Sequence, residues 1–361
     1  MSGLPAVAFA GALALGWLLT FLALRAAPAL ALIDHPDQRR FHTRATPKGG
    51  GLAICAAILL TMGGAILAGH PMGDFVWCEL LGVVLVVVGL IDDMRPLSWQ
   101  LRLGVQMVLA TVLVFGPLSG LEWWVRLLAW FWIVGQTNAF NMLDNMDGLS
   151  GGVACITAAF IGACTLLRFA EGLAEDLVVP QLALMGAVLG FLWFNRPPAR
   201  IFMGDAGSTY LGYVLAVRAL GLGPSAGEAP ALWLAPVCIF AVPCYDLLSV
   251  VLVRLWQRRS PFHADKQHLS HRLVQRGLSS TMAVRVIYLF GIASGFSGLI
   301  IVMAPLAWVA AVVVLQLAVW WVALAVIELC TRRVAAEKLQ TAKSAEALAP
   351  TEAGVREISG R

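Results

Sequence analysis

The chain has 361 residues, of which 60% are hydrophobic and only 13% are charged, and its formal net charge at pH 7 is +4. Soluble domains contain about 45–50% apolar residues, so this composition excludes a soluble globular protein and predicts an all-α polytopic membrane protein. The seven cysteines contain no Cys-x-x-Cys pair, which argues against a zinc site or a disulfide framework.

Eleven apolar segments are long enough to cross a membrane, which takes about 20 residues with a range of about 17–25. They cover roughly residues 4–25, 50–69, 75–92, 101–117, 123–142, 149–168, 178–195, 206–222, 230–254, 283–303 and 306–330. No basic segment precedes the first, so it is not expected to be a cleaved signal peptide. Residues 1–330 are predicted to form a single integral-membrane domain, and residues 331–361 a cytoplasmic tail that is partly helical or disordered.

The distribution of Lys and Arg predicts the orientation, because cytoplasmic loops carry an excess of both. All but three of the 25 basic residues lie after odd-numbered segments or in the tail. The exceptions are Arg126, Arg168 and Arg218. The N-terminus is therefore predicted to lie outside and the C-terminus in the cytoplasm.

Five polar loops fall on the predicted cytoplasmic side. They are residues 34–51, 89–106, 138–149, 195–208 and 260–273. The loops on the other side are short and contain no clustered His, Asn or Asp. Loops far apart in sequence that converge on one membrane face predict a functional site on that face.

The first of these loops combines positive charge with glycine. Arg39, Arg40, His42 and Lys48 precede the run at residues 49–51, where glycines allow a helix or a ligand to approach the backbone closely. A substrate-binding role and an alternative remain open: positive charge typical of the cytoplasmic side, followed by glycines for helix packing.

The second loop contains adjacent carboxylates, Asp92 and Asp93. Consecutive residues of a helix point about 100° apart, so one is expected to face a reaction centre and the other to hold a basic partner or a metal. Carboxylates buried side by side raise one pKa, which suits a general base; the alternative is a pair of acids at a helix end. Arg102 and Gln106 lie four residues apart on the next helix and would line the same cavity or anchor that helix at the interface.

The third loop is the most polar. Asn138, Asn141 and Asn145 share one helical face, while Asp144 and Asp147 lie on a neighbouring face. Such a surface can hold a divalent cation by oxygen ligands. The alternative is a solvated loop that only turns the chain.

The fourth loop contains Asp205 between Gly204 and Gly207, close to a predicted helix start that Ser208 or Thr209 can cap. Free N–H groups at a helix start suit phosphate. Together with the carboxylates of the other loops, this predicts phosphoryl chemistry with a Mg²⁺-type ion.

The last loop is basic. His263, His268 and His271, with Lys266 and Arg272, fit a diphosphate better than a transition metal, and the alternative is a basic loop with incidental histidines. Asp246, inside the ninth segment, is either functional or the partner of an arginine from a neighbouring helix.

In order from about residue 34 to 277, these motifs resemble those of the polyprenyl-phosphate N-acetylhexosamine-1-phosphate transferases, which belong to glycosyltransferase family 4. The matching segments are Asp34-x-Pro-x-x-Arg-x-x-His with Pro47-x-Gly-Gly; Asp92-Asp93 with Leu97, Arg102 and Gln106; Asn138-x-x-Asn-x-x-Asp-x-x-Asp-Gly-Leu; Phe202-x-Gly-Asp-x-Gly-Ser; and the loop from His268 to His271. The eleven helices and outside N-terminus of that family agree with the topology predicted above.

The resemblance implies an enzyme that transfers a sugar-1-phosphate from a UDP-N-acetylhexosamine to undecaprenyl or another polyprenyl phosphate and releases UMP, with Mg²⁺ or Mn²⁺. It implies a multi-pass protein of the bacterial cytoplasmic (inner) membrane, with its active site on the cytoplasmic face, that starts a cell-envelope polysaccharide such as the O-antigen of lipopolysaccharide. The expected partners are both substrates and membrane lipid, with no nucleic acid, and a homodimer is left open.

The resemblance also assigns roles. Asp205 and Asn141 would hold the metal. The catalytic residues would be Asp92, Asp93, Asp144, His268 and His271. Substrate would be bound by Arg39, His42, Lys48, Arg102, Asn138, Asp147, Gly148, Leu149, Lys266 and Arg272. The uridine would lie near Asp147.

This chain departs from the family's motifs at two positions. The last loop has Ser270 where members that use N-acetylglucosamine often have His, and Asn145 replaces the usual Gly after Asp144. The longer His-rich loop of the peptidoglycan branch is missing, so an N-acetylglucosamine-type sugar is favoured over a phospho-MurNAc-pentapeptide-type substrate. A cation-coupled transporter is the rival of another class; it would place polar groups near the bilayer midplane and often contain an internal repeat.

Overall fold

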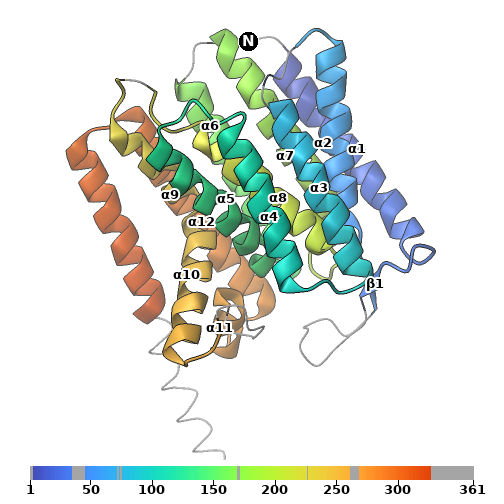
Figure 1. The fold of residues 1–361 in the computed structure, drawn as a ribbon. Helices are drawn as coiled ribbons and strands as arrows, with labels where there is room; N and C mark the ends of the chain where they lie inside the picture. Colours follow the sequence, from blue (N-terminus) through green and yellow to red (C-terminus); the bar gives the residue numbers. More distant parts are fainter. Residues whose placement is uncertain are drawn as a thin grey trace, which may run out of the picture.

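The computed structural model describes residues 3–34, 45–70, 73, 75–168, 171–225, 227–260 and 268–326, and within these it is a bundle of helices (Figure 1). The first part of the chain forms α1 (Leu4–Ala26), the two-residue strands β1 (Ile33–Asp34) and β2 (Thr46–Pro47), α2 (Gly50–Leu67), α3 (Phe75–Met94), α4 (Trp99–Phe115) and α5 (Trp123–Leu143). The second part forms α6 (Leu149–Arg168), α7 (Glu171–Asn195), α8 (Gly204–Leu220), η1 (Pro230–Trp233), α9 (Leu234–Ile239), α10 (Ala241–Trp256), α11 (Leu269–Gln275), α12 (Ser280–Met303) and a last helix at Ala307–Val326.

Helices lie at all of the predicted apolar segments. Among the described residues, six are long and apolar enough to cross a membrane: Leu4–Ala26, Gly50–Leu67, Leu149–Arg168, Leu177–Asn195, Ser280–Met303 and Ala307–Val326. A seventh crossing results if Pro230–Ile239 and Ala241–Trp256, which meet at a 77° bend, form one broken span. The protein is therefore an all-α membrane protein, as its composition predicts.

The remaining predicted spans are shorter or more polar. α4 and α8 have 17 residues each, which corresponds to about 26 Å of helix against a hydrocarbon core of about 30 Å. α3 has three acidic residues, Glu79, Asp92 and Asp93.

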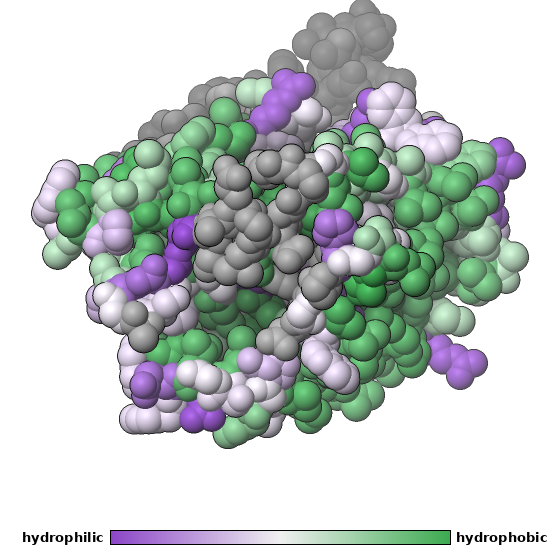
Figure 2. Space-filling view, turned by 90° about the horizontal axis from the view of Figure 1, so that it is seen from above, coloured by the Kyte–Doolittle hydropathy of each residue, from purple (hydrophilic) through white to green (hydrophobic). Residues whose placement is uncertain are grey.

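The outer surface is apolar, as a lipid-facing surface must be. Large side chains such as Leu67, Phe115, Trp123 and Trp256 are at least 69% exposed. Figure 2 shows hydrophobic residues over most of the rim of the bundle.

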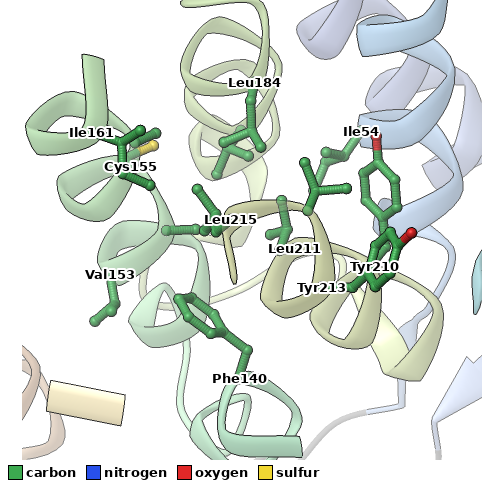
Figure 3. Packing of buried hydrophobic residues seen from close by; sticks show 14 of the residues in the cluster. Ile54, Phe140, Val153, Cys155, Ile161, Leu184, Tyr210, Leu211, Tyr213 and Leu215 are labelled. Atoms are coloured by element: carbon green, nitrogen blue, oxygen red, sulfur yellow. The ribbon is translucent and has the colours of Figure 1, made fainter. Parts of the chain in front are cut away.

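The helix α8 lies at the centre. From Ala206 to Leu220 every residue of α8 is buried, the pattern of a helix enclosed by protein on all sides. Figure 3 shows Leu211 and Leu215 of α8 among Ile54 of α2, Phe140 of α5 and Leu184 of α7. The first residues of α8 are thereby fixed at one end of the bundle, which is also the end of β1 and α11 and lies opposite the N-terminus (Figure 1).

Glycines bring α2 and α3 against the start of α8. A Cβ on Gly51 would lie 2.1 Å from the backbone nitrogen of Gly207, and one on Gly89 would lie 2.4 Å from the Cα of Ala206. Gly50 is equally close to the ring of Phe191. The structure therefore favours the helix-packing interpretation of Gly50 and Gly51.

Candidate active site

The site is built around Asp205, in the first turn of α8. Its Oδ1 accepts a hydrogen bond of 3.0 Å from the Asn141 amide, and its Oδ2 accepts one of 2.6 Å from Arg102. The preceding Gly204 has a φ of +71°, and a Cβ there would lie 2.2 Å from the carboxylate of Asp93. Only glycine meets both conditions, which explains the Gly-Asp pair of the fourth loop.

The adjacent carboxylates at the end of α3 contact different cations. Asp92 accepts hydrogen bonds from the backbone of Leu97 at 2.6 Å and from Arg102 at 2.8 Å. Asp93 lies 3.2 Å from Lys48. Arg102 thus joins Asp92 to Asp205, while Asp93 faces the first loop.

Backbone pairing places Lys48 at the site. The strand β2 is antiparallel to β1, and the backbone of Phe202 donates to the carbonyl of Pro47. The side chain of Lys48 then lies between Asp34, at 3.3 Å, and Asp93. Asp34 is a site residue that sequence analysis noted only within a motif.

The third loop directs its amides to different neighbours. Asn138 donates to Gln106 of α4 at 2.5 Å, which confirms that Gln106 faces this region. Asn141 donates to Ser208 at 3.0 Å as well as to Asp205. Asn145 donates to the carbonyl of Met142 at 2.6 Å and accepts from Ser270.

The turn after α5 is fixed by long-range contacts. Asp147 accepts from the backbone of Ala199 at 2.9 Å. Gly148, with a φ of +76°, donates its N–H to Asn195 and accepts from the hydroxyl of Tyr288. Asn195 stands at the start of a predicted polar loop, whereas no sequence signal marked Tyr288. The side chain of Leu149 is buried in the core and is not exposed to a ligand. Its predicted role in substrate binding would therefore fall to its backbone, and that role remains a prediction.

The last loop brings two histidines to the site. Nδ1 of His268 lies 2.9 Å from Asp246, whose other oxygen accepts from the backbone of Leu269 at 2.6 Å. A carboxylate can only accept, so Nδ1 carries the proton. Asp246, for which an arginine partner was an alternative, therefore orients a histidine. Arg272 is buried and donates to Ser249 at 2.7 Å.

Two cavities meet at this end of the bundle. The first, about 410 Å³, is acidic and is lined by Asp34, Lys48, Asp93, Asp144, Asn145, Met146, Asp147, Asn195, Phe202, Gly204, Asp205, His271 and Ser280. The second, about 510 Å³, is lined by Leu85, Val88, Gly89, Trp99, Arg102, Leu103, Gln106, Asn138, Asn141, Met142, Asn145, Asp205, Thr209, Leu247, Val251, Arg254, His268 and His271. Both contain Asn145, Asp205 and His271.

Most predicted site residues are thus brought together. Gly148, Leu149, Asp92 and Arg272 lie beside the cavities without lining either. Arg39, His42, His263 and Lys266 fall outside the described residues.

The acidic cavity has the ligand chemistry of a hard divalent cation. Its five carboxylates face one lysine, and burial raises the pKa of Asp144 well above its usual range, with the charges of Asp205 and Asp93 raising it further. A diphosphate that enters this cavity faces several carboxylates and one lysine, so added positive charge would favour its binding. In the part of the chain that the structure describes, no three His, Cys, Asp or Glu side chains are arranged around a common metal position. The oxygens of Asp205, Asp144, Asp93 and Asn141 nevertheless fit Mg²⁺ in kind, and Arg102 already holds a positive charge against Asp205.

Comparison with known proteins points to one family. Residues 75–223 match the model of glycosyl transferase family 4. The chain is 31% identical over 310 residues to a probable undecaprenyl-phosphate N-acetylglucosaminyl 1-phosphate transferase of Bacillus subtilis, covering 82% of this chain and 84% of that protein. It is 31% identical over 294 residues to the undecaprenyl-phosphate alpha-N-acetylglucosaminyl 1-phosphate transferase of Escherichia coli K12, covering 75% and 77%. It is 33% identical over 301 residues to a decaprenyl-phosphate N-acetylglucosaminephosphotransferase of Mycobacterium leprae, covering 72% and 74%.

Proposed function

This chain belongs to glycosyl transferase family 4, and we propose that it transfers N-acetylglucosamine-1-phosphate, or a related N-acetylhexosamine-1-phosphate, from a UDP-sugar to undecaprenyl or another polyprenyl phosphate, with release of UMP. The names of its relatives support this reaction over a phospho-MurNAc-pentapeptide-type substrate. They also support an enzyme over a transporter.

The observation that carries the proposal is the meeting of an acidic and a largely apolar cavity at Asp205. The reaction needs a polar nucleotide sugar and a lipid phosphate side by side. The second cavity offers Leu85, Leu247 and Val251 to a lipid chain, while Arg102 offers positive charge to its phosphate. The first cavity would hold the UDP-sugar, with Asp147 near the uridine.

The transfer forms a bond between an oxygen of the lipid phosphate and the β-phosphorus of the UDP-sugar. The bond from that phosphorus to the bridging oxygen breaks, and this oxygen leaves with UMP. As in other phosphoryl transfers, the protein contributes mainly positioning and charge stabilisation.

The described side chains divide these tasks. Asp92 fixes Arg102, whereas Asp93 lines the acidic cavity, so Asp93 is the carboxylate that faces the reacting groups. His271 lines both cavities and can donate a hydrogen bond to the bridging oxygen that leaves with UMP. Asp246 holds His268 with Nδ1 protonated, which leaves Nε2 for the second cavity.

Asp205, Asp144 and Asn141 would hold Mg²⁺ or Mn²⁺ at the junction. The bound ion would neutralise the diphosphate and polarise the β-phosphoryl group. For Asn141 this requires its amide oxygen to turn toward the ion, because its nitrogen now donates to Asp205.

The arrangement in the membrane is part of the proposal. Eleven crossings, with the N-terminus outside and the tail inside, would place both cavities at the cytoplasmic face of the bacterial inner membrane. Residues 1–330 would form the transferase domain. The distribution of Lys and Arg supports this orientation.

Purified protein in detergent, incubated with undecaprenyl phosphate, Mg²⁺ and a panel of UDP-N-acetylglucosamine, UDP-N-acetylgalactosamine and UDP-glucose, tests the proposal. UMP release is expected with an N-acetylated sugar and only when the lipid phosphate is present. Release of UDP, or no release that depends on the lipid, would refute it.

A further inference from the structure

The helices that carry the acidic residues of the site, α3 and α8, pack antiparallel and also meet at their far ends. Asp93 and Asp205 lie at one end of the pair, and Glu79 and Arg218 lie at the other. Asp205 and Arg218 are as far apart along α8 as Glu79 and Asp92 are along α3, about 20 Å in each case. The two contacts between the helices are therefore separated by the same length on both.

The far contact is a buried ion pair. The guanidinium of Arg218 contacts Glu79, and the two side chains are 0% and 2% exposed. The hydroxyl of Tyr210 donates to the second oxygen of Glu79 at 2.5 Å. Arg218 also donates to the carbonyl of Pro180 at 2.7 Å and to the side chain of Gln181 at 3.0 Å. These directional contacts connect α3, α7 and α8 at one position along their axes.

Between the two ends, α3 approaches α8 most closely at two glycines. It faces α8 with Gly82 beside the ring of Tyr210 and with Gly89 beside the backbone of Ala206. Glycines let helices approach closely but provide no side chain that fits between those of the partner. At the active end, Asp93 accepts from the backbone of Asp205 and Ala206 only at 3.4 and 3.5 Å, and such long bonds are weak. The short contacts between Asp92 and Asp205 run through Arg102, whose long and partly exposed side chain can follow a slide of α3.

We propose that the buried Glu79–Arg218 pair sets the register of α3 against α8 and so holds Asp92 and Asp93 at their working distance from Asp205. Glu79 and Arg218 are then positioning residues about 20 Å from the chemistry. A buried charge pair between two apolar helices favours one register of the helices. If one helix slides along the other, the charges separate, and neither lipid nor protein can solvate them.

This role predicts a specific pattern in variants. Removing one partner leaves an uncompensated buried charge and destabilises the fold, so single variants are uninformative. The double variant Glu79→Leu/Arg218→Met replaces the pair by apolar groups of similar size, which folded proteins often tolerate. It removes the directional contact but keeps the packing.

The inference is tested first by a distance that does not depend on activity. Nitroxide labels on Met94→Cys of α3 and Gly221→Cys at the end of α8 report the slide directly, in a Cys330→Ser background. The two labelled positions are exposed, whereas the six described cysteines are buried or half-buried. In the double variant the distance distribution is expected to shift or broaden by at least about 1.5 Å, the rise of one residue. An unchanged distribution would overturn the inference.

The second readout rests on the proposed function. The double variant is expected to keep its melting temperature within a few degrees and its KM for the UDP-sugar, but to lose about 10- to 100-fold in kcat for UMP release, since a misplacement of about 1 Å can cost that much. Glu79→Asp/Arg218→Lys, which keeps the charges, is expected to recover part of this loss. Thr165→Val, which removes a buried hydroxyl bonded within its own helix, is the matched control and should change neither readout.

The outcomes separate the two proposals. A shifted distance in a protein whose wild type releases no UMP supports the register role and refutes the proposed function. A fully active double variant, or a loss of kcat with an unchanged distance, refutes the register role alone.

Discussion

The hydroxyl of Ser270 donates a hydrogen bond of 2.6 Å to the side-chain oxygen of Asn145. These residues are 125 positions apart in the chain, and they are the two places where the sequence departs from the motifs it otherwise resembles. The amide nitrogen of Asn145 is also engaged, by the carbonyl of Met142. The pair thus joins α11 to the turn after α5 at the junction of both cavities.

Loss of this bond is expected to alter sugar selection. Ser270→Ala should raise KM for the preferred UDP-sugar about 2- to 10-fold, the effect of one hydrogen bond. Because the two side chains act as a pair, Ser270→Ala/Asn145→Ala should cost less than the sum of the two single changes. Initial rates with the panel of UDP-sugars measure this. If Ser270→His and Ser270→Ala both left the ranking of sugars unchanged, the pair would not determine specificity.

Removal of the central carboxylates is expected to abolish transfer without unfolding the protein. Asp205→Asn removes the acidic group shared by both cavities, and Asp92→Asn removes one of the two carboxylates that hold Arg102. Each should lower UMP release at least about 1,000-fold, because preorganised charge is the main catalytic contribution in phosphoryl transfer. Membranes containing these variants, with insertion checked by immunoblot, should form no lipid-linked sugar. Product above background from either variant would contradict its assigned role.

The contact between Asp246 and His268 predicts a third effect. Asp246→Asn keeps the shape of the side chain but removes the charge that fixes His268 with Nδ1 protonated. We expect kcat to fall about 10- to 100-fold, with a smaller change in KM for the UDP-sugar. Leu252→Ala, at an exposed position of α10 that lines neither cavity, is the control. Equal losses in both variants would indicate a general disturbance of α10 instead of an oriented histidine.

Metal removal tests the interpretation of the acidic cavity. EDTA should abolish UMP release, and Mg²⁺ or Mn²⁺ should restore it, because the carboxylates of that cavity otherwise repel the diphosphate. Titration of Mn²⁺ followed by electron paramagnetic resonance should show a bound ion that Asp205→Asn weakens. Full activity in chelator would contradict this interpretation.

The comparison of sequence and structure shows which features were local enough to predict. The helices follow from long apolar runs, and the distribution of basic residues predicts that the five polar loops share one side, since both patterns are visible within short segments. Asp205, Asn141 and Asp93 were predicted together because each lies in a polar group beside a span. The structure places all three at the same cavities or beside them.

Pairings across the bundle could not be predicted. The partner of Asp246 is a histidine 22 residues away, and that of Glu79 is an arginine in α8. Tyr288 reaches the carbonyl of Gly148 from α12. A single sequence contains no signal for such pairings, because they depend on how the helices pack. The enclosure of α8 by other helices was equally hidden: its 17 residues need not match a lipid layer by themselves, because neighbouring helices surround them.

The most direct test of the proposed reaction follows the β-phosphate. UDP-N-acetylglucosamine labelled with ³²P in the β-position is incubated with undecaprenyl phosphate, Mg²⁺ and the wild-type protein, and the organic and aqueous phases are separated. Transfer of the sugar-1-phosphate places the label in the lipid phase and leaves unlabelled UMP in water, whereas Asp205→Asn should leave the label in water. Labelled UDP in the aqueous phase, with the sugar alone on the lipid, would contradict the account.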